Sequence, residues 1–155
     1  MLIAVALAAL LTAAPSAPST EEKAVLAAVQ GFFDSMVTKD AVAAKKILIP
    51  EGRLFSVRVQ DGKKIVRSSS NQDFIDGLAK SDAAWLERMW DPEVKIRGDI
   101  ATVWTPYDFH INGKFSHCGI DAFDLVKKDG AWMISGGTYT VERTGCAESP
   151  LGPPK

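Results

Sequence analysis

The sequence has no strong excess of either charge. Its 18 lysine and arginine residues nearly balance 19 aspartate and glutamate residues, so the formal net charge is −1 at pH 7. Proteins that bind nucleic acids usually carry a basic surface for the phosphates, and this balance therefore argues against a nucleic-acid partner. Charged residues make up 24% and apolar residues 46% of the 155 residues, ordinary values that predict one globular domain.

The apolar run near the N-terminus is too short to cross a bilayer. Residues 2–11 are all apolar, whereas a membrane-spanning helix needs about 20 such residues, so we expect no stable membrane insertion. Small residues and two prolines follow, a pattern typical of a secretory signal peptide. We therefore predict a signal peptide over residues 1–18, cut between Thr12 and Ser19, and export to the periplasm or out of the cell.

The signal-peptide interpretation leaves alternatives open. No Lys or Arg precedes the apolar run, so either the true start lies upstream or the basic segment is weak. An ordinary buried N-terminal helix fits less well, because nothing caps it and prolines follow at once. No cysteine lies near the cut, which disfavours a lipoprotein.

Cysteine is scarce, with Cys118 and Cys146 the only two in the chain. Two cysteines in an exported protein most simply form one disulfide, which would tie the segment after Val141 back to the preceding strands. The alternative is two free thiols, with Cys118 as a small core residue. A nucleophilic pair of Cys118 and His117 is disfavoured, because adjacent strand residues point to opposite faces.

The stretch from Ile100 to Glu142 carries the clearest structural signal. Asn112-Gly113 and Asp129-Gly130 each separate runs rich in β-branched and aromatic residues. Such dipeptides reach positive φ cheaply, as two-residue hairpin turns require. The pattern predicts three long, consecutive antiparallel strands.

Counting outward from these two turns predicts which side chains share a face of the sheet. Asp108 would face His117, Trp104 would face Asp121, and Asp121 would in turn face Thr138. This face is apolar at one end and polar at the other, as ligand pockets often are. We expect the pocket to be lined by Trp104, Asp108, His117, Asp121, Phe123 and Thr138. The opposite face is more uniformly apolar and suits a homodimer contact or a second packed layer. A one-residue error in a turn would exchange the faces of a whole strand.

The N-terminal half predicts helices and a hairpin. Ser19 and Glu22 form a capping-box pattern before a long amphipathic helix that ends near Thr38, and Asp40 can cap a second helix up to Leu48. We further expect a hairpin around Asp61-Gly62, a third helix over residues 72–80, and a strand over residues 85–96 that is broken near Pro92.

This order of elements is an α+β plan. We expect a cone-shaped, curved antiparallel sheet packed on N-terminal helices, with a cavity toward its open end. The domain would span residues 19–146, followed by a disordered tail over residues 147–155.

The predicted order resembles the nuclear transport factor 2-like superfamily, a cystatin-like roll that includes ketosteroid isomerases, scytalone dehydratase and polyketide cyclases. V-W-T-P-Y-D-F at 103–109, G-K-F-S-H-C-G-I-D-A-F-D-L-V at 113–126 and W-M-I at 132–134 more closely resemble its lumazine-binding branch. The resemblance covers residues 21–146 and implies the fold. It does not imply one reaction, because the branch mostly lacks an assigned activity.

His117, Asp108 and Asp121 are the candidate catalytic residues. A carboxylate beside an imidazole orients the ring and raises its pKa, as a general base requires. Asp121 against an indole in a dry pocket would stay protonated and could act as an acid or hydrogen-bond donor. Equally, His117 and Asp121 could only satisfy neighbouring buried groups. His110 could complete a metal site with these residues, but it lies near a turn, so we expect neither a metal nor a cofactor.

Three functions remain open at this point. The chain could be an exported domain that binds a small, partly apolar ligand, an isomerase or dehydratase that uses Asp108, His117 and Asp121, or a dimeric interaction domain with a vestigial pocket. The state of the cavity distinguishes the third function from the first two.

Overall fold

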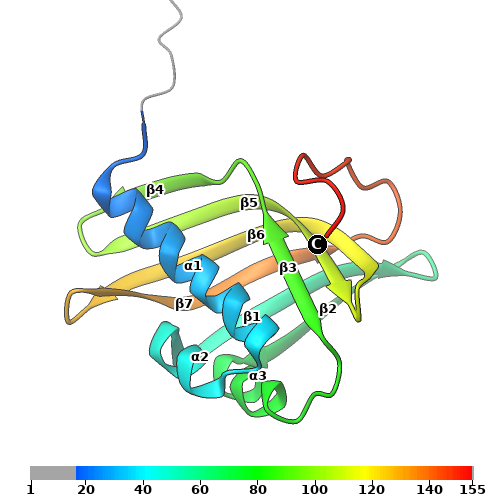
Figure 1. Cartoon of the computed structure of the whole chain (residues 1–155), viewed down its shortest axis with the longest axis horizontal. Helices are drawn as coiled ribbons and strands as arrows, with labels where there is room; N and C mark the ends of the chain where they lie inside the picture. The colour runs from blue at the N-terminus through cyan, green and yellow to red at the C-terminus, as the bar shows by residue number, and fades with distance from the viewer. Residues whose placement is uncertain (1–16, 155) are drawn as a thin grey trace, which may run out of the picture.

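A computed structural model describes residues 17–154, and its elements follow the predicted order (Figure 1). The helices and strands are α1 (Thr20–Thr38), α2 (Ala41–Ile47), β1 (Leu48–Gln60), β2 (Lys63–Ser70), α3 (Asn71–Leu78), β3 (Trp85–Met89), β4 (Glu93–Arg97), β5 (Ile100–Ile111), β6 (Lys114–Lys128) and β7 (Ala131–Val141). The predicted signal peptide lies almost wholly outside the described residues. Within them, no helix is both long and apolar enough to span a membrane.

The predicted helix caps are confirmed. The Ser19 hydroxyl accepts a hydrogen bond from the Glu22 backbone N–H at the start of α1, and the Glu22 carboxylate accepts one from the Ser19 N–H. The Asp40 carboxylate caps α2 by accepting from two backbone N–H groups. These bonds satisfy amides that a helix start leaves unpaired.

The fold is α+β. Its strands form one curved sheet in the order β2-β1-β7-β6-β5-β3, with β4 also paired to β5. The sheet is mixed rather than purely antiparallel, because β1 runs parallel to β7. Helix α1 crosses the concave face, while α2 and α3 lie near one end of the sheet (Figure 1). One stripe of α1 is buried against the sheet and includes Val25, Val29, Phe32, Phe33 and Met36.

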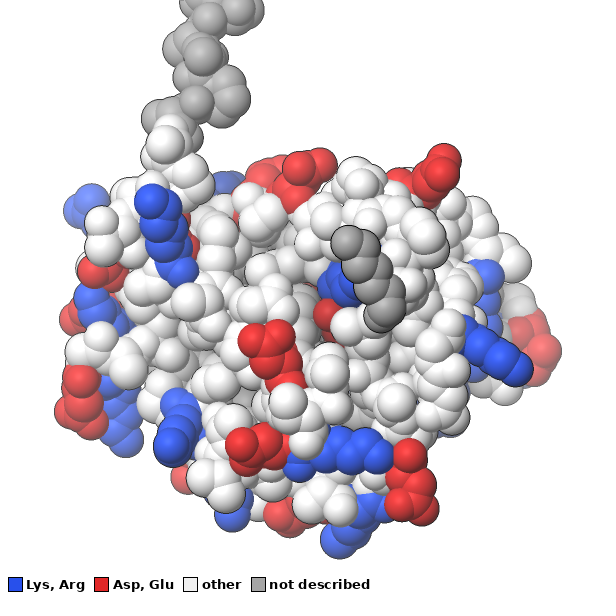
Figure 2. Space-filling view, in the orientation of Figure 1, with Lys and Arg blue, Asp and Glu red and all other residues white. Residues whose placement is uncertain are grey.

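Charged side chains of both signs are interspersed over the surface seen in Figure 2, in keeping with the small net charge. This face shows no broad basic area of the kind that tracks a nucleic-acid backbone.

The predicted hairpin turns are confirmed. Asn112 and Asp129 have φ values of 52° and 52°, and the glycines that follow them also have positive φ. Asp61-Gly62, between β1 and β2, adopts the same conformation. Asn, Asp and Gly reach this left-handed region at the lowest steric cost, which explains why these dipeptides mark the turns.

The predicted pairing beyond the turns is wrong, because each hairpin contains a β-bulge. In the first hairpin His110 pairs with Phe115, but Phe109 pairs with His117, so Ser116 is an extra residue on β6. In the second, Leu125 pairs with Ile134, but Asp124 pairs with Gly136, so Ser135 is an extra residue on β7. One inserted residue changes which side chains of two strands share a face.

The bulges reassign the faces of the sheet. Asp108 pairs with Cys118 rather than with His117, and Trp104 pairs with Ala122 rather than with Asp121. Asp121 pairs with Tyr139 rather than with Thr138. The concave face therefore takes the odd-numbered residues of β5 together with the odd-numbered residues of β6.

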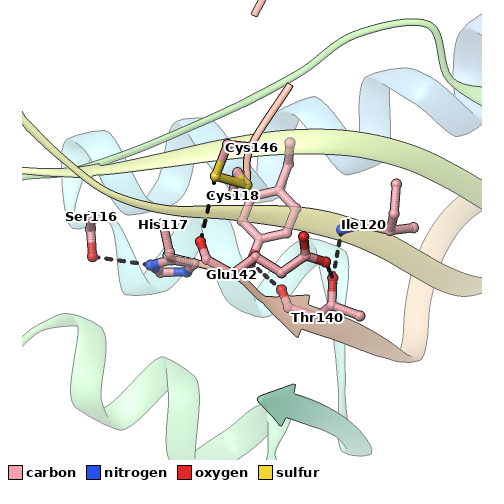
Figure 3. The surroundings of a disulfide bond; sticks show 8 residues. Ser116, His117, Cys118, Ile120, Thr140, Glu142 and Cys146 are labelled. Atoms are coloured by element: carbon pink, nitrogen blue, oxygen red, sulfur yellow. Dashed lines mark hydrogen bonds between the residues drawn. A yellow bond between two sulfur atoms is a disulfide. The ribbon is translucent and has the colours of Figure 1, made fainter. Parts of the chain in front are cut away.

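The predicted disulfide between Cys118 and Cys146 is present (Figure 3). Cys118 of β6 forms an isolated antiparallel bridge with Glu142, so the segment after β7 begins next to β6. The last residues then pack beside β3 and β5, where the Arg88 guanidinium donates to the Gly152 carbonyl at 2.9 Å.

Replacing Cys118 and Cys146 together by serine should lower the free energy of unfolding by roughly 3–4 kcal/mol, because the bond closes a long loop in the unfolded chain. Urea unfolding of the oxidised protein and the double variant measures the difference. The unchanged protein under reducing conditions is the matched control and should lose a similar amount. Equal stability of all three would contradict the structural role of the bond.

Candidate functional site

A cavity of about 310 Å³ lies between the helices and the concave face of the sheet. It is bordered by residues from α1, α3 and six strands: Phe32, Met36, Leu54, Ser69, Phe74, Trp85, Glu87, Tyr107, Phe109, Ile111, His117, Asp121, Phe123 and Tyr139. Most of these side chains are apolar or aromatic. The few polar groups among them are therefore the ones that can orient a ligand.

Aromatic rings form most of the wall. Phe32 of α1 packs against Phe74 and Phe123 with ring centroids 5.0 Å and 5.8 Å apart. Trp85 and Phe109 continue the wall, with their centroids 6.4 Å apart. Such tilted and edge-on arrangements are favourable for aromatic pairs, and they leave ring surfaces that suit a flat molecule.

Two carboxyl groups, Glu87 of β3 and Asp121 of β6, border the same space and lie close enough that each shifts the pKa of the other. Asp121 is only 2% exposed, and its Oδ2 has no hydrogen-bond partner within residues 17–154. Glu87 is partly exposed because it borders the cavity. Burial and mutual repulsion both disfavour two charged carboxylates at this place, so the pair favours a state that holds at least one proton.

Burial sets the proton affinity of this pair. Loss of hydration raises the pKa of Asp121 to about 7. Burial also raises the pKa of Glu87 well above its usual value, and the neighbouring Asp121 charge adds to the effect. A neutral carboxyl is therefore available as a hydrogen-bond donor inside the cavity near neutral pH.

Two tyrosines lie near the carboxyl pair. The Tyr107 hydroxyl donates to the Thr140 carbonyl at 2.6 Å, and burial raises its pKa. Burial also raises the pKa of Tyr139, although a hydrogen bond with Ser56 acts in the opposite direction. Both phenols thus stay protonated, and Tyr139 borders the cavity directly opposite Asp121 in the register.

His117 borders the cavity between two aromatic side chains. Its ring centroid lies 5.0 Å from that of Phe109 and 5.8 Å from that of Tyr107. Its Nδ1 lies 3.0 Å from the Ser116 hydroxyl (Figure 3). Burial lowers the pKa of His117, and the positive charge of Arg143 lowers it further. The imidazole is therefore mainly neutral at pH 7, and it can donate one hydrogen bond and accept another.

The structure divides the predicted pocket residues into two groups. His117, Asp121 and Phe123 border the cavity, and their part in binding or catalysis remains a prediction. The expectation that Trp104, Asp108 and Thr138 face the same space is wrong, because the bulges turn them to the convex face.

Each displaced residue has different surroundings from those expected. Trp104 is 54% exposed, and Thr138 is exposed beside it. Asp108 is paired with Arg88, whose Nε donates to Oδ1 at 2.9 Å. The predicted pair of Asp108 and His117 therefore does not exist.

The residues that the sequence suggested as possible metal ligands lie on opposite faces of the sheet. His110 lies on the convex side with Asp108, its Nδ1 3.6 Å from Oδ1, whereas His117 faces the cavity. Burial lowers the pKa of His110, although the Asp108 charge acts in the opposite direction.

Sequence reasoning missed Glu87, Tyr107 and Tyr139. Glu87 had a detectable signal, because it alternates with Trp85 and Met89 and is the one charged residue on that apolar side of a short strand. Tyr107 and Tyr139 were missed through the same register error that misplaced Asp108 and Thr138. Each tyrosine is the chain neighbour of one of these residues, so it was expected on the face away from the pocket.

Comparisons with known proteins agree with this fold. The family model described as "Putative lumazine-binding" matches residues 20–140. A search of curated proteins finds no match to this sequence.

Three solved structures illustrate the structural likeness. A protein of unknown function with a cystatin-like fold from Nostoc punctiforme is 12% identical, with a TM-score of 0.63 over 86% of this chain and 97% of its own. An NTF2-like protein from Cytophaga hutchinsonii is 12% identical, with a TM-score of 0.65 over 79% and 99% of the chains. A protein described as a "putative dehydratase from the NTF2-like family" of Streptomyces avermitilis is 16% identical, with a TM-score of 0.59 over 79% and 96%. At these identities the likeness shows the fold alone.

The carboxyl pair predicts a specific pH dependence of stability. The folded protein keeps the Asp121 proton up to about pH 7, whereas the unfolded chain releases it near pH 4. The folded state thus binds more protons between these values, and this group makes the free energy of unfolding fall as the pH rises. Asp121→Asn removes that titration, so the variant should gain stability relative to the wild type from pH 4 to pH 8, by on the order of a few kcal/mol.

Urea unfolding across this pH range measures the effect. Asp124→Asn is the matched control, because Asp124 is an exposed carboxylate on the same strand. Its stability profile should run parallel to that of the wild type. A parallel profile for Asp121→Asn would contradict the buried, protonated carboxyl.

Proposed function

Because the chain belongs to the "Putative lumazine-binding" family of the nuclear transport factor 2-like superfamily, we propose that it binds a small, flat, partly apolar molecule in the cavity beneath α1. The observation that carries this proposal is an aromatic-walled space with a protonated carboxyl pair inside it. The apolar wall supplies affinity, and the carboxyl pair supplies orientation.

The polar groups indicate what the enclosed end of the ligand should carry. A neutral carboxyl and a tyrosine hydroxyl both donate hydrogen bonds, and the neutral His117 can do the same. A carbonyl oxygen or an unprotonated ring nitrogen satisfies such donors, whereas an anion would meet the negative charge of the pair. A flat heteroaromatic ring or a conjugated ketone has this chemistry.

Export belongs to the same proposal. The bond between Cys118 and Cys146 is compatible with an oxidising compartment, where disulfides persist. The N-terminal apolar run has the composition of a signal peptide. The protein would then bind its ligand outside the cytoplasm.

An acid–base enzyme of the isomerase or dehydratase kind is the second candidate. Asp121 and Glu87 share a proton near neutral pH, so one can accept a proton while the other donates one. His117 lies on the same wall as a further proton carrier. Asp108 has no place in this scheme, because its ion pair with Arg88 lies on the convex side. The third candidate, an interaction domain with a vestigial pocket, would be favoured by a cavity filled with its own side chains, which is not what the described residues form.

The binding proposal predicts that the neutral dye N-phenylnaphthylamine fluoresces when mixed with the protein and that filling the cavity abolishes the signal. Ser69 borders the cavity from β2, so Ser69→Trp should occupy the space and weaken the dye by at least about tenfold. Ser68→Trp is the matched control, because Ser68 is exposed on the same strand and should leave binding unchanged. Absence of dye binding to the folded wild type would contradict the proposal.

The enzyme candidate predicts exchange of α-hydrogens in a conjugated cyclic ketone. NMR in deuterated water would follow the exchange at pH 7. Asp121→Asn and Glu87→Gln should each slow it by about 100-fold, since general acid–base groups contribute on that scale. Exposed Asp124→Asn serves again as the control. If the dye binds but no exchange occurs with a panel of such ketones, the site is a binding site without this chemistry.

A further inference from the structure

Three arginines lie together near the end of the cavity formed by β1, β2 and β7. Leu54 and Ser69 pair in register, and both border the cavity. Two positions further along, Ser56 pairs with Arg67, so Arg67 lies on the same face. Arg58 follows Ser56 on this face of β1.

Arg143 completes the group from just beyond β7. Arg58, Arg67 and Arg143 border one cleft of about 870 Å³, formed by residues of β1 and β2, the end of β7 and the residues that follow it. The cleft is also bordered by Lys64 and by one acidic residue, Glu142. Its charged lining is therefore strongly basic, although the chain as a whole is nearly neutral.

Two of the arginines act on residues of the cavity wall. The charge of Arg143 lowers the pKa of His117, and the charge of Arg58 has the same direction of effect on the pKa of Tyr139. Both guanidinium groups thus lie within electrostatic range of groups that a ligand in the cavity would contact.

Within residues 17–154, Glu142 is the single acidic residue that borders the cleft of the three arginines. No ion pair joins Arg58, Arg67 or Arg143 to a carboxylate there, in contrast to Arg88 with Asp108. The Nε of Arg58 is buried and has no hydrogen-bond partner among the same residues. The Glu142 carboxylate in the same cleft forms no ion pair with these arginines among the described residues, and its Oε1 accepts a hydrogen bond from the Thr140 hydroxyl at 3.0 Å. A buried donor without a partner is costly and is normally satisfied by some group.

We propose that Arg58, Arg67 and Arg143 form a subsite for an acidic group on the ligand, a carboxylate, phosphate or sulfonate whose apolar body lies in the cavity. Guanidinium groups bind such oxyanions through paired, charge-assisted hydrogen bonds. The inference rests on the proposed function and narrows the ligand class to flat molecules with one acidic end.

The two ends of the site then fix the orientation of the ligand. The Glu87–Asp121 pair disfavours an anion and favours a neutral acceptor, whereas the arginine cluster favours an anion. The acidic group should therefore lie at the arginines, and the uncharged end should lie at the carboxyl pair.

Two dyes with the same ring skeleton test the subsite. Anilinonaphthalene sulfonate carries an anionic group, and N-phenylnaphthylamine lacks it. The sulfonate should bind about tenfold more tightly than the neutral dye, because charge-assisted hydrogen bonds from the guanidinium groups stabilise only the anionic dye. Fluorescence titration of both dyes against the full chain measures the ratio.

Single variants then locate the contact. Arg67→Gln and Arg143→Gln replace exposed residues, so they should fold, and each should weaken the sulfonate by about tenfold while leaving the neutral dye within about twofold. Arg97→Gln, on β4 away from the cleft, is the matched control for net charge and should change neither dye. Competition by naphthoate and by naphthyl phosphate, each against the bound sulfonate, distinguishes a carboxylate site from a phosphate site.

The remaining outcomes distinguish a failure of the arginine subsite from a failure of the binding proposal. If the neutral dye binds but the sulfonate binds no better, or if Arg97→Gln weakens it as much as Arg67→Gln does, the subsite is wrong and the cavity proposal stands. If neither dye binds, the proposed function fails first, and the subsite fails with it.

Discussion

The alternation of side chains along a strand is the constraint on which the site depends. Ser116 is one residue more than β6 needs to match β5, and this bulge brings Tyr107 and Phe109 to the same face as His117 and Asp121. Without it, Asp108 and Trp104 would lie in the cavity instead, and the wall would be far more polar. A single inserted residue thus determines the chemistry of the enclosed space.

Burial of the Glu87–Asp121 pair opposes folding, and the surrounding structure has to compensate for it. The compensation comes from apolar packing, in which Phe32 and Phe33 of α1 contact Phe123 of the sheet. Such a pair would be a poor choice for stability alone, since apolar residues of similar volume would avoid the desolvation cost. Its presence in a cavity, rather than in the packed core, is the physical reason to assign it a role in recognition or proton transfer.

Local chemistry could be predicted from the sequence, whereas long-range register could not. The turns at Asn112-Gly113 and Asp129-Gly130 and the caps at Ser19 and Asp40 depend on neighbouring residues only, and all four are confirmed. The pairing of Cys118 with Cys146 followed from their number.

The errors share one physical origin. Ser116 and Ser135 have no local feature that distinguishes a bulge from a regular strand position, and the bulges form because two distant segments must match in length and twist. Counting from a turn was therefore correct up to each bulge and wrong beyond it. Glu87 was missed because its partner Asp121 lies 34 positions away in the chain, and no sequence pattern links the two.

Arg88, Asp108 and Cys118 occupy one row across β3, β5 and β6 on the convex side, and Glu87 is the neighbour of Arg88 on the concave side. Arg88 also donates a hydrogen bond to the Gly152 carbonyl. The C-terminal segment is therefore attached to this row by the Cys118–Cys146 disulfide and by this hydrogen bond. A clamp on the outside of the short edge strand therefore limits how far Glu87 can shift toward or away from Asp121. The geometry of proton sharing inside the cone is in this way set partly by residues that no ligand in the cavity would touch.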